Sequence, residues 1–245
     1  FTGWRLDRRD YSFAFDSADH DDGVKTFLGH TGDLSGQDVV DIVTHHPASP
    51  RWVASRAWSN FAYPTDPSDP VLDDLVAAYT PDLSLSALFR ALFLHPDFRG
   101  SQARSGLVKQ PIEYVVGAVR VLAPDLLGPQ AETLSQGPAG LLSGVLAQLG
   151  QVPFNPPNVG GWPQNGYWLT TASSLARLRF ATTLARRADL SAVEDAPPSG
   201  RVDATARLLG ISEWSDSTSS ALSQVSGDPR SLVALALVSP EYVLN

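Results

Sequence analysis

The segment between residues 150 and 170 constrains the fold more than any other part of the chain. Its four prolines and its repeated glycines and asparagines exclude a continuous helix or a plain strand. Loops longer than about 12–15 residues inside a compact domain are usually functional, or are held by packing of their own side chains. We therefore expect an ordered Pro/Gly/Trp loop, capped by Thr170 or Thr171 where an amphipathic helix begins and runs to Arg187.

The chain from residue 35 onward shows a helical pattern. Apolar side chains recur at helical spacing, for example Leu88, Phe89 and Leu92, and short acceptor-proline pairs precede several of these runs. Residues 189–200, which contain Pro197-Pro198-Ser199-Gly200, are predicted to form a surface linker. The first predicted helices are Gln37–His45 and one that begins at Ser49-Pro50, with Val53, Ala57, Trp58 and Phe61 facing inward. Further helices are predicted around an apolar stripe from Leu85 to Phe93 and around the inward-facing Ile112, Val115, Val116 and Val119. The others are Pro138–Leu149, closed by Gly150, Thr171–Arg187, and two that start at Asp69-Pro70 and Asp228-Pro229.

Residues 1–34 differ from this body. Trp4 and Leu6, then Phe13 and Phe15, alternate with polar residues on either side of a polar turn, which predicts a β-hairpin. A further short strand is expected at Val24–Leu28. We therefore predict a mainly α, multi-helix fold, with a short β-rich N-terminal segment at 1–34 and a helical body at 35–245.

Composition excludes several classes of function. The 245-residue chain carries a net charge of −8 and has a pI near 5.0, which argues against a nucleic-acid partner. No apolar run approaches the ~18–20 residues of a membrane span. The absence of cysteine excludes disulfides and thiol chemistry, and the absence of both cysteine and methionine suits an oxidising, extracytoplasmic setting.

The densest ionisable cluster contains His20, Asp21 and Lys25, around a glycine at position 23. A histidine beside carboxylates suits a general base, so these three residues are candidate catalytic groups. The alternative is a structural turn, in which aspartates cap backbone amides and Lys25 pairs with one of them.

Lys109 and Glu113 form a second candidate pair at the start of a predicted helix. Only two lysines, Lys25 and Lys109, stand against 16 arginines, so an ammonium group that arginine cannot replace is one interpretation and arginine-rich codon usage is the other. Glu113, if buried, suits acid–base catalysis. The alternative is a carboxylate that stabilises a helix N-terminus and forms a local ion pair with Lys109.

The loop supplies the candidate binding residues, which are aromatic side chains with polar neighbours. Such a set suits a sugar ring or a peptide partner, with an arginine for an anionic contact. The alternative is structural: the tryptophans pack between helices and the asparagines satisfy backbone groups. The candidates are Asn155, Asn158, Trp162, Tyr167, Trp168 and Arg177.

No metal or cofactor is expected. His45-His46-Pro47 lacks the spacing of a metal site, and no phosphate-binding loop, dinucleotide fingerprint or hydrolase nucleophile motif occurs in the sequence.

Several motifs resemble, in order, those of the bacterial domain of unknown function 1800 family. They are Phe1-Thr2-Gly3-Trp4, His20 to Gly29, Lys109 to Tyr114, Asn155 to Pro163, Trp168 to Thr171, Leu175-Ala176-Arg177 and Ser239-Pro240-Glu241-Tyr242. The resemblance implies a long helical region before the Thr-Gly-Trp block. We therefore expect this chain to be the C-terminal part of a larger domain, with its own N-terminal region as a first partner.

The resemblance also implies a function. Family members are exported, often by a twin-arginine signal, and are typically encoded beside an exported domain of unknown function 1501 protein. The first hypothesis is accordingly a secreted or cell-surface helical scaffold that acts in a complex with such a partner. The alternatives are an extracytoplasmic hydrolase acting on cell-wall or polymer substrates, in which the candidate catalytic residues and the loop converge on one cleft, and a polysaccharide-binding module.

Overall fold

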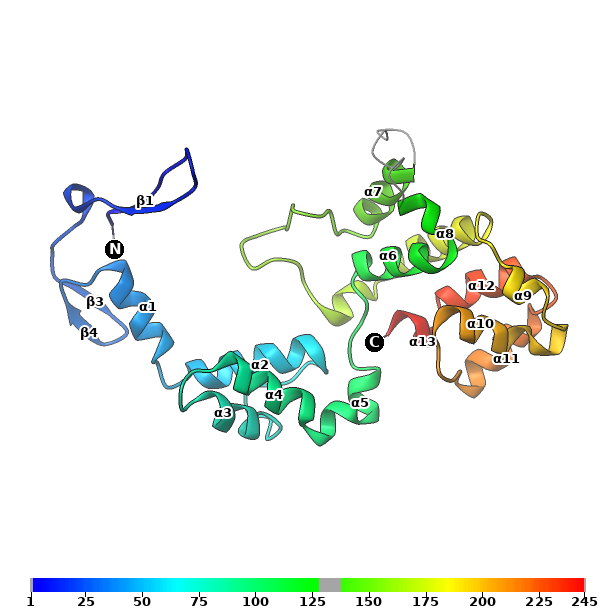
Figure 1. Ribbon diagram of the computed structural model, residues 1–245, viewed down its shortest axis with the longest axis horizontal. Coiled ribbons are helices and arrows are strands. Elements are labelled where there is room, and N and C mark those ends of the chain that lie inside the picture. The colour runs from blue at the N-terminus through cyan, green and yellow to red at the C-terminus, as the bar shows by residue number, and fades with distance from the viewer. Residues whose placement is uncertain (1, 128–137, 245) are drawn as a thin grey trace. The chain divides into compact units, whose positions relative to one another are not determined.

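The computed structural model describes residues 2–127 and 138–244 (Figure 1). Contacts divide the chain into two compact units: Phe1–Trp58 with Thr65–Leu94, and Ser59–Pro64 with His95–Asn245. The boundary predicted at residue 34 separates segments by secondary structure, whereas the contacts group the β-rich segment with the first helices. The mainly α fold with a small N-terminal hairpin is confirmed.

The N-terminal segment forms two hairpins. Strands β1 (Trp4–Leu6) and β2 (Phe13–Phe15) pair antiparallel, as predicted, with Trp4 opposite Phe15 and Leu6 opposite Phe13. After the 3-10 turn η1 (Ser17–Asp19), β3 (Lys25–Phe27) pairs with β4 (His30–Gly32). Leu28 and Gly29, at φ 46° and 86°, make the turn between them. Positive φ at both central residues is what a type I′ hairpin turn requires.

The first unit also contains four helices: α1 (Gly36–Thr44), α2 (Ser49–Phe61), α3 (Leu72–Tyr79) and α4 (Leu85–Leu94). Ser35 and Asp38 form a capping box at α1, so the predicted start of this helix is confirmed. Trp58, Leu75 and Leu88 are fully buried. Phe61, predicted to face inward, is instead half exposed, since the buried face of α2 follows Ala54, Ala57 and Trp58.

The second unit is helical, and its main pairing joins α8 (Thr171–Ala185) to α12 (Pro229–Leu237). Thr170 and Asp228 cap these helices, and Gly150 adopts φ 83° behind α7, all as predicted. The other elements are η2 (Pro96–Arg99), α5 (Ser101–Arg104), α6 (Pro111–Leu122), η3 (Pro124–Leu127), α7 (Pro138–Gln148), η5 (Asn165–Trp168), α9 (Ser191–Glu194), η6 (Pro198–Gly200), α10 (Arg201–Leu209), α11 (Asp216–Gln224) and α13 (Pro240–Val243).

Two details of this unit differ from expectation. On α6 the buried face includes Tyr114 and Ala118, whereas Ile112 is partly exposed. The predicted linker at 189–200 folds into α9 and η6, and it contributes Leu190 and Val193 to the core. Its proline and glycine residues interrupt the helices without removing the segment from the packing. Among the described residues, no helix has the combined length and apolarity needed to cross a bilayer.

The α8–α12 contact provides a test of this core. Leu232→Ala removes a fully buried side chain of α12 and should lower the free energy of unfolding by about 2–5 kcal/mol, because a cavity is left behind. Leu175→Ala, at a half-exposed site on α8, should cost less than about 1 kcal/mol. Denaturant titration followed by circular dichroism compares the two, and equal losses would contradict this description of the core.

Candidate functional site

The loop between α7 and α8 has buried ends and an exposed middle. At its start Gln151 is buried, with its side-chain oxygen accepting from the Ile112 N–H (2.9 Å) and its amide donating to Gln110 Oε1 (2.7 Å). In the middle, Phe154 and Val159 are fully exposed, at 100% and 110% of the reference area. Local turns order this middle part: the Asn155 N–H donates to the Val152 carbonyl and the Gly161 N–H to the Asn158 carbonyl.

The asparagines predicted to bind a ligand lie in the exposed part of the loop. Asn155 is exposed, and Asn158 accepts a hydrogen bond from the Gly160 N–H (2.8 Å) within its own turn. A third asparagine, not singled out from the sequence, has the long-range role: Asn165 Oδ1 accepts from the Val108 N–H at 3.1 Å. Asn165 also adopts φ 54°, a conformation that asparagine tolerates better than most residues. Its position before an aromatic pair gave no signal of this contact.

The three aromatic candidates have different surroundings. Trp168, at the end of η5, is only 2% exposed and belongs to the core, and Trp162 packs partly buried against the same core. Tyr167 is 64% exposed and contacts the edge of Trp168, with ring centroids 5.3 Å apart. The structural interpretation therefore holds for the tryptophans, and Tyr167 presents the exposed aromatic face.

Arg177 is a buried cation that joins two segments. It is 2% exposed on α8, with Nη1 donating to the Trp168 carbonyl (2.8 Å) and Nη2 to the Lys109 carbonyl (3.2 Å). Its guanidinium lies 5.3 Å from the centre of the Tyr114 ring. Burial lowers the pKa of Arg177, yet an arginine stays protonated at neutral pH. Within 2–127 and 138–244, no carboxylate forms an ion pair with it, and its Nε is buried without a hydrogen-bond partner.

Lys109 is partly buried against the C-terminal turn of the chain. Its Nζ donates to the Tyr242 carbonyl (2.6 Å) and lies 4.2 Å from the centre of the Tyr242 ring. Burial lowers the pKa of Lys109, while the charge of Glu113 opposes that change. Burial also raises the pKa of Tyr242 to about 12. A lysine pKa below 10.5 in the folded state means that the buried charge costs stability at neutral pH, and that this cost falls as the pH rises towards 10.5.

Glu113 has a local role in the structure. It is exposed, and its Oε2 accepts from the Gln110 N–H (2.8 Å) at the start of α6. This contact satisfies a free donor of the helix N-terminus, as the structural alternative expects. The exposed position does not provide the buried carboxylate that acid–base catalysis would require.

In the first unit, His20 and Lys25 converge on Asp33. His20 Nδ1 donates to the Thr2 carbonyl (3.0 Å), and Nε2 faces Asp33 Oδ1 at 3.6 Å. Lys25 Nζ donates to the same Oδ1 (3.0 Å), and this contact lowers the pKa of Asp33. Asp21 points elsewhere and caps the Gly23 N–H (2.8 Å). The predicted turn is thus present, but Lys25 pairs with Asp33, which the sequence did not single out.

These contacts also bear on metal binding. Ligand atoms of His20, Asp22 and Asp33 come within 4.8 Å of one another, a spacing that could hold an ion. However, the ammonium of Lys25 already forms an ion pair with the Asp33 carboxylate, and both aspartates are exposed. A cation would have to displace Lys25 to gain that carboxylate.

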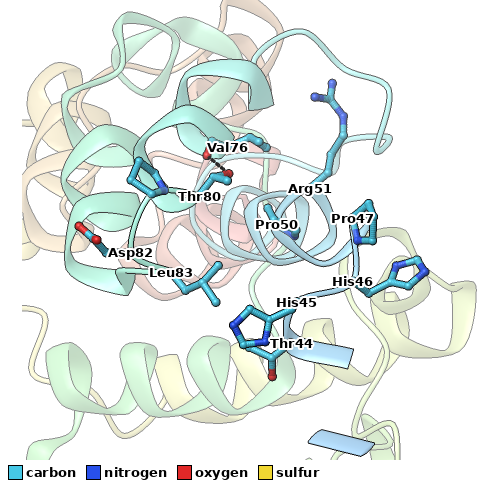
Figure 2. A pocket seen from close by; sticks show the side chains of 11 residues that line it. Thr44, His45, His46, Pro47, Pro50, Arg51, Val76, Thr80, Asp82 and Leu83 are labelled. Atoms are coloured by element: carbon cyan, nitrogen blue, oxygen red, sulfur yellow. Dashed lines mark hydrogen bonds between the residues drawn. The ribbon is translucent and has the colours of Figure 1, made fainter. Parts of the chain in front are cut away.

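A pocket of about 650 Å³ in the first unit lies between the end of α1, the start of α2 and the α3–α4 connection (Figure 2). His45 and His46 both line it, although their spacing predicted no site. Their hydrogen bonds differ: His45 Nδ1 donates to the Asp41 carbonyl (2.9 Å), whereas His46 Nδ1 accepts from the Ala48 N–H (3.1 Å). Two other polar lining side chains have partners within the chain: Arg51 donates to Asp73 (2.7 Å), and Thr80 donates to the Val76 carbonyl.

The candidate catalytic residues thus fall into two groups. His20, Asp21 and Lys25 belong to the first unit, and Lys109 and Glu113 to the second, together with the loop. Convergence of all of them on one cleft stays a prediction.

Comparison with known proteins identifies the family. The model of the family described as "Protein of unknown function (DUF1800)" matches residues 1–244. The chain belongs to the DUF1800 family. The resemblance seen in the sequence motifs is therefore confirmed over essentially the whole chain. No curated protein and no solved structure matches it.

The two lysines of this DUF1800 chain allow a direct titration. NMR of the Lys109 side chain should give a pKa below 10.5, because burial disfavours the ammonium. Glu113→Gln should lower this pKa further, since the carboxylate favours the charged form. With one other lysine in the sequence, Lys25→Arg assigns the signals. A Lys109 pKa at or above 10.5 would contradict the buried position.

The asparagines provide a second test. Asn165→Ala should destabilise the protein by about 1–3 kcal/mol, because the partly buried Val108 N–H loses its acceptor. Asn165→Gly should cost less than Asn165→Ala, since glycine accepts the positive φ. Asn158→Ala, at an exposed turn, should stay within about 0.5 kcal/mol. Thermal unfolding of the three variants checks this order.

Proposed function

We propose that this DUF1800 chain acts as an exported helical scaffold that binds another protein through residues 152–161, the contact loop. The observation that carries the proposal is the full exposure of Phe154 and Val159 in a segment that is ordered at both ends. These two side chains do not pack against the chain, so their apolar character does not contribute to the stability of the fold. Two fully exposed apolar side chains in one loop would favour an interaction surface if they form a contiguous patch.

The backbone of the contact loop supports the same proposal. Phe154 adopts φ 63°, a conformation that non-glycine residues rarely hold without compensation elsewhere. Prolines at 153, 156 and 157 restrict the same stretch. A loop ordered before binding loses little conformational entropy on association, so more of the contact energy contributes to affinity.

A second apolar surface lies in the first unit. The register of β1 and β2 places Trp4, Leu6, Phe13 and Phe15 on one face of a two-stranded hairpin, and all four are exposed. An isolated two-stranded hairpin is at best marginally stable in water. This exposed apolar face supports a role in which another protein binds to and covers the hairpin.

The alternatives find less support in the geometry. A polysaccharide-binding surface needs open aromatic faces, and of the three aromatic candidates Trp168 is buried and Trp162 packs on the core. A hydrolase needs groups within reach of a shared substrate, whereas Glu113 accepts from the Gln110 N–H and Lys109 Nζ donates to the Tyr242 carbonyl. An extracytoplasmic setting is proposed from the absence of cysteine and methionine.

The test uses the domain of unknown function 1501 protein that the family resemblance implies as a partner. Phe154→Ser with Val159→Ser should weaken binding at least about 100-fold, because each buried apolar side chain contributes roughly 1.5–3 kcal/mol. Isothermal titration calorimetry with the purified partner measures the affinity. The fold should be unaffected, since neither side chain packs against the chain.

The matched control is Val121→Ser, at a half-exposed valine on α6 outside the contact loop. It should leave the affinity unchanged. Wild-type affinity in the double variant, with the partner bound, would show that another surface makes the contact and would refute the role of the loop.

A further inference from the structure

A small pocket beside Arg177 has the composition of a ligand site. It measures about 250 Å³ and is formed by the first turns of α8 together with the α12–α13 segment. Its lining is apolar, including Leu169, Val238 and Val243, apart from Arg177 and the hydroxyl of Ser174. Apolar walls with a few polar groups are what small-molecule sites share.

The charge of Arg177 is not compensated within the described chain. Arg177 is only 2% exposed, yet the two hydrogen bonds of its guanidinium go to neutral carbonyl groups. Its Nε is buried and has no acceptor. An ionised group buried without a counter-charge is costly, and an anion bound beside it would remove much of this cost.

The pocket also restricts the kind of anion. Arg177 supplies the charged donor among the described lining residues, whereas the Ser174 hydroxyl already donates to the Thr170 carbonyl (3.0 Å). This lining suits a single negative charge, and a phosphate dianion would require more donors than it offers. Lys109 does not line the pocket, and its Nζ donates to the Tyr242 carbonyl. The volume lies below the ~300–1,000 Å³ of sites for drug-sized ligands, so the ligand must be small.

We propose that this pocket binds a small monocarboxylate with an apolar body, its carboxylate against Arg177 and its apolar group between α8 and α12–α13. Two sources share this chemistry: a free aliphatic acid and the C-terminal residue of a peptide. The proposal is independent of the contact loop, which does not line the pocket.

The experiment compares three probes by saturation-transfer NMR and by calorimetry. N-acetyl-leucine carries the carboxylate, the isobutyl group and a peptide amide; 4-methylpentanoate lacks the amide; N-acetyl-leucine methyl ester lacks the charge. Binding of both acids indicates a free acid as ligand, whereas binding of N-acetyl-leucine alone indicates a peptide C-terminus. Either result supports the site. Failure of both acids to bind, or equal binding of the ester, would overturn it.

Variants locate the binding. Arg177→Gln should weaken acid binding roughly tenfold or more, because a charge-assisted hydrogen bond is lost. This variant also removes the contacts to the Trp168 and Lys109 carbonyls and could unfold the region. Ser174→Tyr avoids that problem, since Ser174 is exposed on α8 and a larger side chain there obstructs the pocket.

The matched control is Ala172→Tyr, at an exposed position of the same helix that does not line the pocket. Acid binding should be lost in Ser174→Tyr and kept in Ala172→Tyr. Unchanged acid binding in Ser174→Tyr would place the ligand elsewhere and refute this site. The variant with Phe154→Ser and Val159→Ser should still bind the acids even when it no longer binds the partner protein. The proposals for the contact loop and for the pocket can therefore be refuted independently.

Discussion

The Arg177 guanidinium is the interaction on which the second unit depends. It holds the carbonyl of Trp168, where the long loop ends, and the carbonyl of Lys109, just before α6. The Lys109 N–H in turn donates to the Val243 carbonyl, and its Nζ to the Tyr242 carbonyl. One buried cation and one lysine thus tie α6, α8 and the end of the chain together. Their family-like motifs, far apart in sequence, therefore lie next to one another in the fold.

This arrangement explains why several candidate functional groups are better understood as parts of the fold. Glu113 caps a helix, Asp21 caps a turn, and Lys25 pairs with Asp33. What the packing does not explain is more informative. Phe154 and Val159 are apolar and exposed, and Arg177 is charged and buried with no carboxylate partner among the residues that the structure describes. Both run against the ordinary distribution of side chains between core and surface, and for each we propose a partner outside the chain.

The two features imply different partners. An exposed apolar loop suits the surface of another protein, because burying it is favourable without directional bonding. A buried guanidinium beside an apolar pocket suits a small anion, because a charge in a low-dielectric site requires a counter-charge at short range. The two proposals together give a scaffold for protein contact with a separate small-ligand site in its second unit.

The sequence by itself determined the features that depend on neighbouring residues. The β1–β2 hairpin, the caps at Ser35, Thr170 and Asp228, and the left-handed Gly150 follow from local alternation, side-chain acceptors and glycine. Only the tertiary structure decided that Tyr114 rather than Ile112 is buried on α6, and that Asn165 rather than Asn158 holds a distant amide. Asn165 and Val108 lie 57 residues apart in the sequence. On α6, the apolar stripe has two edges of similar composition, so the sequence does not show which edge is buried. Such choices depend on which segments meet in space, and no local pattern encodes that.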